Sequence, residues 1–342
     1  LFLSAIKSEN KKVAALKIIF GGIMMAFGMS AWGGITFFII PIGIFILALP
    51  FIRKDHKFLL WSIPLFIGIF ILITGSFERP GLRFVFGLGG ISLMLPTIFL
   101  VSSIFVQKIS KDKNKIRNSL FLLLSIILIG SFTMILSEEL DLHLIPSFRY
   151  LNALFPLLTT IDPLVDSVAE HQTTSMELSF ILHSVWMIFA GIGIWLLLFK
   201  KTSQTFVKND MKVFVLIIGM TGVYIASSFI RLEIFASLSL IILSSIALSI
   251  LTKNIFKIKL FGIKNYLFKI SYVVIIVFLF TLPLVFPDVN NWIETMDTPP
   301  VIMTGGTQFS DPTNDWLETL EWIKFNTPEN AVIASWWDYG YW

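Results

Sequence analysis

Cysteine is absent from the sequence and charged residues are scarce. Without cysteine among its 342 residues, the chain can form neither disulfides nor thiolate metal sites. The absence of cysteine does not indicate the cellular compartment. Charged residues make up 14% of the chain, against about 25% in an ordinary soluble domain. Because 56% of the residues are hydrophobic, one soluble core cannot bury them all, and lipid must be the solvent for much of the chain.

Long apolar runs take the place of the missing charge. Each run is long enough, or nearly so, to cross a hydrocarbon layer of about 30 Å as a helix. We therefore predict an α-helical polytopic membrane protein with about nine transmembrane helices within residues 1–287. The runs cover residues 13–34, 36–52, 58–76, 83–106, 118–136, 179–199, 212–230, 233–252 and 269–287.

The loops between these runs alternate in charge. All but five of the 26 Lys and Arg residues lie in one alternating set of loops, and all but four of the 22 acids lie in the other. The positive-inside rule makes the basic set cytoplasmic. We therefore expect a multi-pass protein of the cell membrane with a cytoplasmic first residue and an extracytoplasmic segment 288–342. The basic residues lie in the loops on one side of the membrane. The net charge of +4 therefore indicates membrane lipids as partners and no nucleic acid.

Two segments on the predicted outer side are too long to be simple turns. Residues 137–178 form a long loop, and residues 288–342 open what we predict to be an α/β extracytoplasmic domain. Apolar residues at helical spacing predict an amphipathic helix that contains Trp316 and Leu320. The run "AVIAS" at 331–335 predicts a short strand after a turn.

The most specific pattern is "WWDYG" at 336–340, some 49 residues beyond the last apolar run. Two indole N–H donors from Trp336 and Trp337 and one carboxylate acceptor from Asp338 can surround a single small hydroxyl. Such a site rejects a ligand without that hydroxyl. The alternative is an interfacial aromatic belt or ordinary core packing.

Two further candidates lie on the same predicted side. Glu170 and His171 stand in "SVAEHQ" within the long loop, where exposed carboxylates are also common without any function. Arg231 stands in "SSFIRLEIF" at the end of an apolar run, where its planar fork would suit a phosphate or pyrophosphate. Its alternative is an arginine that snorkels to the interface.

Taken together, these motifs resemble the catalytic subunit of oligosaccharyltransferase, the enzyme of asparagine-linked glycosylation. "WWDYG" is complete, "SVAEHQ" resembles the outer-loop glutamate motif of the family, and "MSAWGG" at 29–34 resembles another family segment. The resemblance covers essentially the whole chain. It implies a C-type glycosyltransferase architecture, with these nine runs matching the later part of a thirteen-span region.

The resemblance also implies a reaction. A glycan passes from a dolichol-type lipid-pyrophosphate donor to the asparagine of Asn-x-Ser/Thr in an acceptor polypeptide. It implies that Glu170 binds and activates the acceptor amide, that Trp336, Trp337 and Asp338 grip the Ser/Thr hydroxyl, and that Arg231 stabilises the leaving pyrophosphate. His171 is a further possible participant, with a loop-ordering hydrogen bond as its alternative, and Arg149 is left without a role.

The sequence departs from the family pattern in one respect. Family members hold Mg²⁺ or Mn²⁺ with two early acidic motifs, and no D-x-D occurs in this chain. We therefore expect the metal ligands before Leu1 and expect the chain to be an inactive piece of an archaeal-type single-subunit enzyme. The alternatives are another lipid-sugar-dependent membrane glycosyltransferase and, from a different class, a transporter or membrane scaffold.

Overall fold

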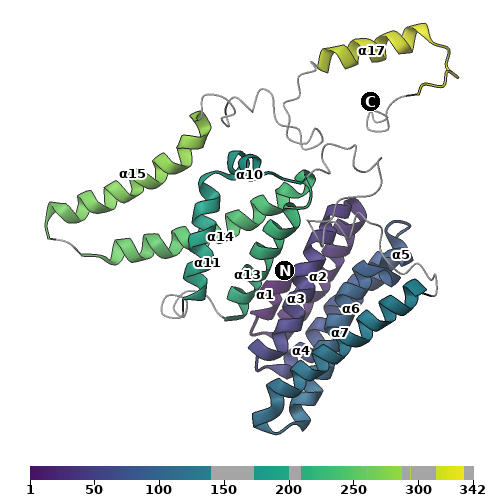
Figure 1. Ribbon diagram of the computed structural model, residues 1–342, viewed down its shortest axis with the longest axis vertical. Helices are drawn as coiled ribbons and strands as arrows, with labels where there is room; N and C mark the ends of the chain where they lie inside the picture. Colours follow the sequence, from purple (N-terminus) through teal and green to yellow (C-terminus); the bar gives the residue numbers. More distant parts are fainter. Residues whose placement is uncertain (140–172, 200–208, 260, 287–292, 294–312, 335–342) are drawn as a thin grey trace.

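A computed structural model describes residues 1–139, 173–199, 209–259, 261–286, 293 and 313–334. Throughout these ranges the only regular structure is helical (Figure 1). Eight of the helices are long and apolar enough to cross a membrane. The chain is therefore a polytopic α-helical membrane protein, as the composition predicts.

The amino-terminal helices form a first group that ends at residue 139. Asn10 caps the second of them, since its side-chain oxygen accepts from the backbone N–H groups of Lys12 and Val13. In chain order the group comprises α1 (Phe2–Ile6), α2 (Lys11–Ala31), η1 (Gly33–Ile35), α3 (Thr36–Ile52), α4 (His56–Ser76), α5 (Gly81–Phe86), α6 (Leu88–Ile109), η2 (Asp112–Asn114) and α7 (Lys115–Glu139).

Large apolar side chains fill the space between α2, α3, α4 and α6. Phe45, Phe66 and Phe70 are almost wholly buried there, and the ring of Phe2 from α1 packs 4.6 Å from the ring of Phe66. Residues on the opposite faces stay exposed, for example Leu72 with 75% of its surface accessible. Apolar residues on both faces are what a lipid-facing bundle requires.

The helices after residue 172 form a second group. Its members are α10 (Met176–His183), α11 (Val185–Leu198), α13 (Asn209–Ala226), η4 (Ile230–Leu232), α14 (Glu233–Lys257) and α15 (Ile263–Val285). Helix α14 packs along both α11 and α13, whereas α15 touches α11 over a short stretch (Figure 1). Helix α17 (Thr313–Asn326) follows later in the chain.

Aromatic rings of α3, in the first group, pack against rings of the second group. The ring of Phe37 stacks 4.2 Å from that of Phe235 of α14, and the ring of Phe45 lies edge-on, 5.1 Å from that of Phe214 of α13. At the end of α3, the guanidinium of Arg53 donates to Asp210 at 2.9 Å and to the carbonyl of Ile6 at 3.1 Å. The groups are thus tied along α3 by rings and at its end by an ion pair.

Arg53 also contacts Asp55, which affects the pKa of Arg53 more than Asp210 does. Hydrogen bonding to Asp55 raises the pKa of Arg53 above its ordinary value, burial opposes this, and the negative charges of Asp55 and Asp210 add to the rise. Because the pKa moves upward from an already high value, the guanidinium stays charged at every pH at which such a protein is folded.

Eight of the nine predicted runs form helices long and apolar enough to cross a membrane, whereas the ninth forms two shorter helices. The run 179–199 is not one continuous helix, because Ser184 has φ 45° and ψ −122° between α10 and α11. That backbone conformation is rare for a residue with a side chain, and it separates the end of α10 at His183 from the start of α11 at Val185. An apolar run carries no signal of such a break.

Within residues 288–342 the outcome is mixed. The amphipathic helix containing Trp316 and Leu320 is confirmed as α17. The predicted strand at 331–335 is not formed over residues 331–334, which have no regular structure, and residue 335 lies outside the described residues. The α/β character expected of this segment therefore stays a prediction.

Candidate functional site

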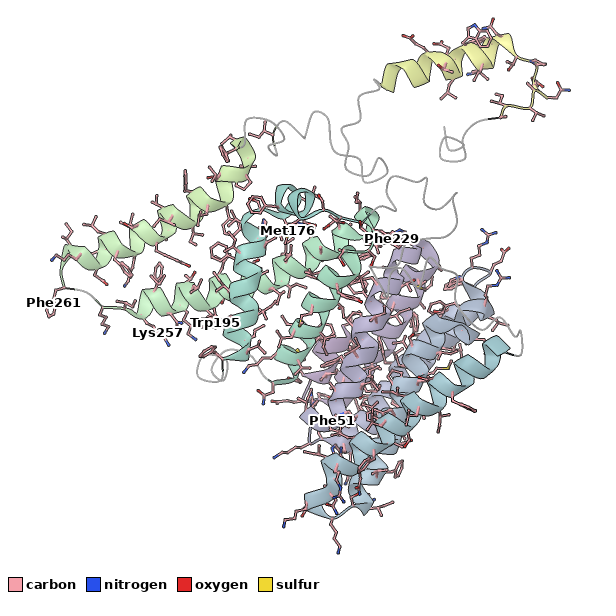
Figure 2. The ribbon with its side chains drawn as sticks, viewed as in Figure 1. Phe51, Met176, Trp195, Phe229, Lys257 and Phe261 are labelled. Carbon is pink, nitrogen blue, oxygen red and sulfur yellow. The ribbon has the colours of Figure 1, made fainter. Side chains whose placement is uncertain are left out.

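Three connections between helices meet at one end of the bundle, which we call the α10 end. Figure 2 labels Met176, the first residue of α10, and Phe229, which precedes η4, at this end, with Phe51 of α3 far from both. The third connection is η1, because the indole of Trp32 next to it stacks 5.9 Å from the ring of Phe235 in α14. The α10 end thus gathers the "MSAWGG" segment, the turn around Arg231 and the chain that follows "SVAEHQ".

The "MSAWGG" segment is shaped by its tryptophan and its second glycine. A Cβ built on Gly34 would collide with the indole of Trp32, so a side chain at this position would displace the ring. The hydroxyl of Thr36 donates to the carbonyl of Gly33, which closes the turn before α3. The glycine therefore allows Trp32 to fold back beside α14.

Arg231 lies in the middle of η4, the short helix between α13 and α14. The residues on its amino-terminal side, Ser228, Phe229 and Ile230, are buried. The backbone N–H of Leu232 donates to the carbonyl of Phe229 at 2.9 Å, which fixes the turn. The structure thus places the backbone of Arg231 at the α10 end, where the sequence pattern predicts a pyrophosphate-binding arginine.

A buried polar network lies directly after Arg231. Glu233, the first residue of α14, has its Oε2 2.7 Å from Nε2 of His183, the last residue of α10. Its Oε1 accepts a hydrogen bond from the hydroxyl of Ser179 at 3.1 Å. His183 is 5% exposed and Glu233 is 6% exposed, so water reaches little of either.

Ser237 completes this network from one turn further along α14. Its hydroxyl donates to the backbone carbonyl of Glu233 at 3.1 Å and lies 3.5 Å from Nδ1 of His183. Both carboxylate oxygens of Glu233 and both ring nitrogens of His183 therefore face a polar group. Such full pairing is required, because a buried charge without partners is strongly destabilising.

A second tie joins the same two parts of the chain. The hydroxyl of Thr174 donates to the backbone carbonyl of Ala226, the last residue of α13, at 3.2 Å. Thr174 precedes α10 and Ala226 precedes the turn that carries Arg231. The segment 174–183 is thus attached on both sides of that turn, at Ala226 and at Glu233.

Sequence reasoning missed His183 and did not use Glu233. Glu233 lies two residues after Arg231, and its hydrogen-bond partner His183 stands 50 residues earlier in the chain. The available signal was an acid in the first turn of an otherwise apolar helix, which is costly in lipid and therefore points to a buried partner. The identity of that partner could not be read from the sequence.

Most of the predicted site residues lie outside the described residues. This holds for Glu170 and His171 of the long loop and for Trp336, Trp337 and Asp338 of "WWDYG", and also for Arg149. Their roles stay predictions. Among the described residues, no group of three His, Asp or Glu side chains could hold a metal ion. The described part of the α10 end therefore does not fit a divalent cation by itself.

Comparison with known proteins gives related sequences over almost the whole chain. The chain is 25% identical over 332 residues to the dolichyl-diphosphooligosaccharide–protein glycosyltransferase subunit STT3 of Dictyostelium discoideum, covering 91% of this chain and 44% of that protein. It is 22% identical to subunit STT3B of Arabidopsis thaliana, covering 100% of this chain and 49% of that protein. The chain is homologous to the STT3 subunits of oligosaccharyltransferase.

The remaining comparisons refine this relation. The dolichyl-phosphooligosaccharide–protein glycotransferase of the archaeon Methanocaldococcus jannaschii is 61% identical over a short segment of 28 residues, 8% of this chain and 3% of that protein. No family model matches the chain. The chain spans less than half the length of the Dictyostelium and Arabidopsis relatives.

Proposed function

We propose that this chain is part of an oligosaccharyltransferase catalytic subunit that transfers a glycan from a lipid-pyrophosphate donor to asparagine in Asn-x-Ser/Thr. The observation that carries the proposal is homology to STT3 subunits over 91% or more of the chain. The α10 end supports it, because the turn around Arg231, the segment 29–34 and the chain after Glu170 meet there. A dolichol-type carrier and an archaeal source belong to the same proposal.

The acceptor amide sets the chemical problem. Its nitrogen lone pair is delocalised into the carbonyl, so the amide is a poor nucleophile. A carboxylate that accepts hydrogen bonds from its N–H groups can hold it in position and increase its reactivity. We assign this role to Glu170, and we assign recognition of the Ser/Thr hydroxyl to Trp336, Trp337 and Asp338.

The leaving pyrophosphate requires a positive partner. A guanidinium can bind two phosphate oxygens at once and counter the charge that develops as the sugar departs. We assign this role to Arg231, whose turn lies at the α10 end. His171 is a further candidate at the acceptor side, without an assigned step.

The α10 end must then face the side on which donor and acceptor meet. The charge pattern supports a topology with residue 1 in the cytoplasm and with residues 288–342 and the α10 end on the extracytoplasmic side. We further propose that transfer requires Mg²⁺ or Mn²⁺. The resemblance to the family supports this requirement, and the roles assigned to Glu170 and Arg231 do not involve the cation.

An assay of membranes from cells expressing the complete gene tests the proposal. The membranes receive lipid-linked oligosaccharide and fluorescent peptides with Asn-x-Thr or Asn-x-Ala, with and without EDTA. We expect EDTA-sensitive glycosylation of Asn-x-Thr only, and strong losses in the Glu170→Gln and Asp338→Ala variants. A Lys324→Ala variant, altered on exposed helix α17, serves as the control and should match wild type.

Other outcomes would contradict the proposal. Glycosyl transfer to a lipid with no peptide modified would favour a different lipid-sugar-dependent glycosyltransferase. Equal glycosylation of both peptides would remove the hydroxyl-reading role from "WWDYG" and leave this cluster as aromatic packing.

A further inference from the structure

We propose that Glu233 and His183 form a positioning dyad that fixes the Arg231 turn relative to the chain segment following Glu170. The inference rests on the proposed function, because it assigns these residues to the donor and acceptor sides of one reaction. Glu233 and His183 touch neither substrate in this proposal. They act by holding together the two segments that carry Arg231 and Glu170.

The location of the dyad gives the first argument. Glu233 follows Arg231 by two residues and is the first residue of α14, directly after η4. Its two carboxylate oxygens bind two residues of one short helix, Ser179 and His183 of α10. One carboxylate therefore fixes both the position and the rotation of α10 beside the Arg231 turn.

The helix break gives the second argument. His183 ends α10, and Ser184 then adopts φ 45° before α11 begins. A continuous helix over 176–198 would keep α10 in line with α11 without any side-chain tie. Because the chain breaks here, α10 depends on other contacts for its orientation, and the 2.7 Å contact between His183 and Glu233 supplies one at the break itself.

The short distance along the chain to Glu170 gives the third argument. The hydroxyl of Thr174 is held by the carbonyl of Ala226, and Thr174 follows Glu170 by four residues. Four residues span at most about 14 Å of extended chain. The dyad and the Thr174 tie therefore limit how far the acceptor side of the site can move from the donor side.

The cost of the arrangement gives the fourth argument. A buried, hydrogen-bonded polar pair usually contributes little net stability, and a well-packed apolar pair could replace it. In a membrane such groups are expensive and commonly functional. A dyad that serves only stability would be an unfavourable choice here, whereas directional bonds to a carboxylate fix an orientation that apolar packing would leave loose.

A double-mutant cycle on the complete protein tests the dyad. Donor kinetics are measured for wild type, Arg231→Ala, Glu233→Gln and the double variant. We expect Glu233→Gln to lower kcat/KM for the donor on the order of 10- to 100-fold, since small misplacements of a binding group have effects of this size. In the Arg231→Ala background the same change should have less than about a twofold effect, because the two residues act as one unit.

Matched variants separate positioning from general stability. Ser244→Ala removes a buried hydrogen bond to the carbonyl of Trp186, which joins the same helix α14 to α11 away from Arg231. It should leave kcat/KM for the donor within about twofold of wild type. His183→Gln keeps an N–H donor for Glu233 and should retain more activity than His183→Leu. Equal losses by Glu233→Gln in both Arg231 backgrounds would overturn the proposal.

A distance measurement makes the test independent of activity. Spin labels on Thr173→Cys and Val223→Cys, as the only cysteines, report the separation of the chain before α10 from α13; both positions are exposed. We expect a narrow distance distribution that broadens in Glu233→Gln and stays narrow in Ser244→Ala. An unchanged distribution in Glu233→Gln refutes the dyad even if the protein transfers no glycan, whereas absent peptide glycosylation alone refutes only the proposed function.

Discussion

Phe45, Phe66 and Phe70 fill the space between α2, α3, α4 and α6 with rings, whereas aliphatic side chains such as Leu243 share the contacts between α11, α13 and α14 with small and polar residues. A Cβ on Gly222 of α13 would lie 2.7 Å from the carbonyl of Phe235, so the backbones of α13 and α14 need this glycine to come so close. The hydroxyl of Ser239 in α14 donates to the carbonyl of Ile218 in α13 at 2.9 Å.

The difference separates a packed scaffold from a region of directional contacts. Within the described residues, the largest fully buried side chains all belong to α2, α3, α4 and α6. Rings and aliphatic chains give stability without specifying one angle between helices, whereas hydrogen bonds fix orientation. The group that carries Arg231 adds buried hydrogen bonds between α11, α13 and α14 to its apolar clusters, which suits a region where geometry decides activity.

The largest expected effect is on the scaffold. Phe66→Ala should lower the free energy of unfolding in detergent by about 3–5 kcal/mol, because it leaves a cavity among buried rings. Chemical denaturation of the purified protein measures this change. Leu72→Ala, on the same helix but 75% exposed, is the control and should change stability far less. Similar losses for both would show that α4 has no buried face in solution.

The next effect concerns turnover. Arg231→Ala should lower the rate of peptide glycosylation by about 10²–10³-fold, which corresponds to about 2.7–4 kcal/mol of transition-state stabilisation. Thermal unfolding should stay close to wild type. Arg83→Ala removes an exposed arginine of α5 in the first group and should retain full activity. Equal activity of both variants would contradict the special role of the second group.

A smaller effect is expected where the two groups join. Asp210→Asn weakens the 2.9 Å contact with Arg53 and should cost about 1–2 kcal/mol of stability, because Asn keeps an acceptor but loses the charge. Asp55→Asn alters the more exposed partner of the same arginine and should cost under about 1 kcal/mol. The reverse order would mean that the exposed pair, and not the one between groups, holds Arg53.

The smallest effect compares two buried serines. Ser244→Ala in the second group loses its bond to Trp186 and should cost about 1 kcal/mol. Ser62→Ala in the first group removes a buried hydroxyl that has no hydrogen-bond partner within the described structure, so its effect should be close to zero or slightly stabilising. Denaturation midpoints of the two variants, measured side by side, decide between a polar and an apolar mode of packing.

Hydropathy and charge predicted the helices well, because each membrane helix must satisfy its own backbone and therefore leaves a long apolar run. They failed at Ser184, where a single backbone angle divides an apolar run without changing its composition. They also could not pair His183 with Glu233, because that contact depends on how α10 lies against α14. Motif resemblance predicted the enzyme family, while Glu170 and the "WWDYG" residues stay predictions.

The spacing of the two donors to Glu233 sets a rule for tolerated length changes. Ser179 and His183 stand four residues apart, one helical turn, so both point to the same side of α10. Inserting one residue between Thr174 and Ser179 would rotate this side of α10 by about 100° relative to the hydrogen bond between Thr174 and Ala226. An insertion ahead of Thr174 would leave the register of α10 intact, so evolution can lengthen or shorten the preceding loop while the ten residues 174–183 keep a fixed length.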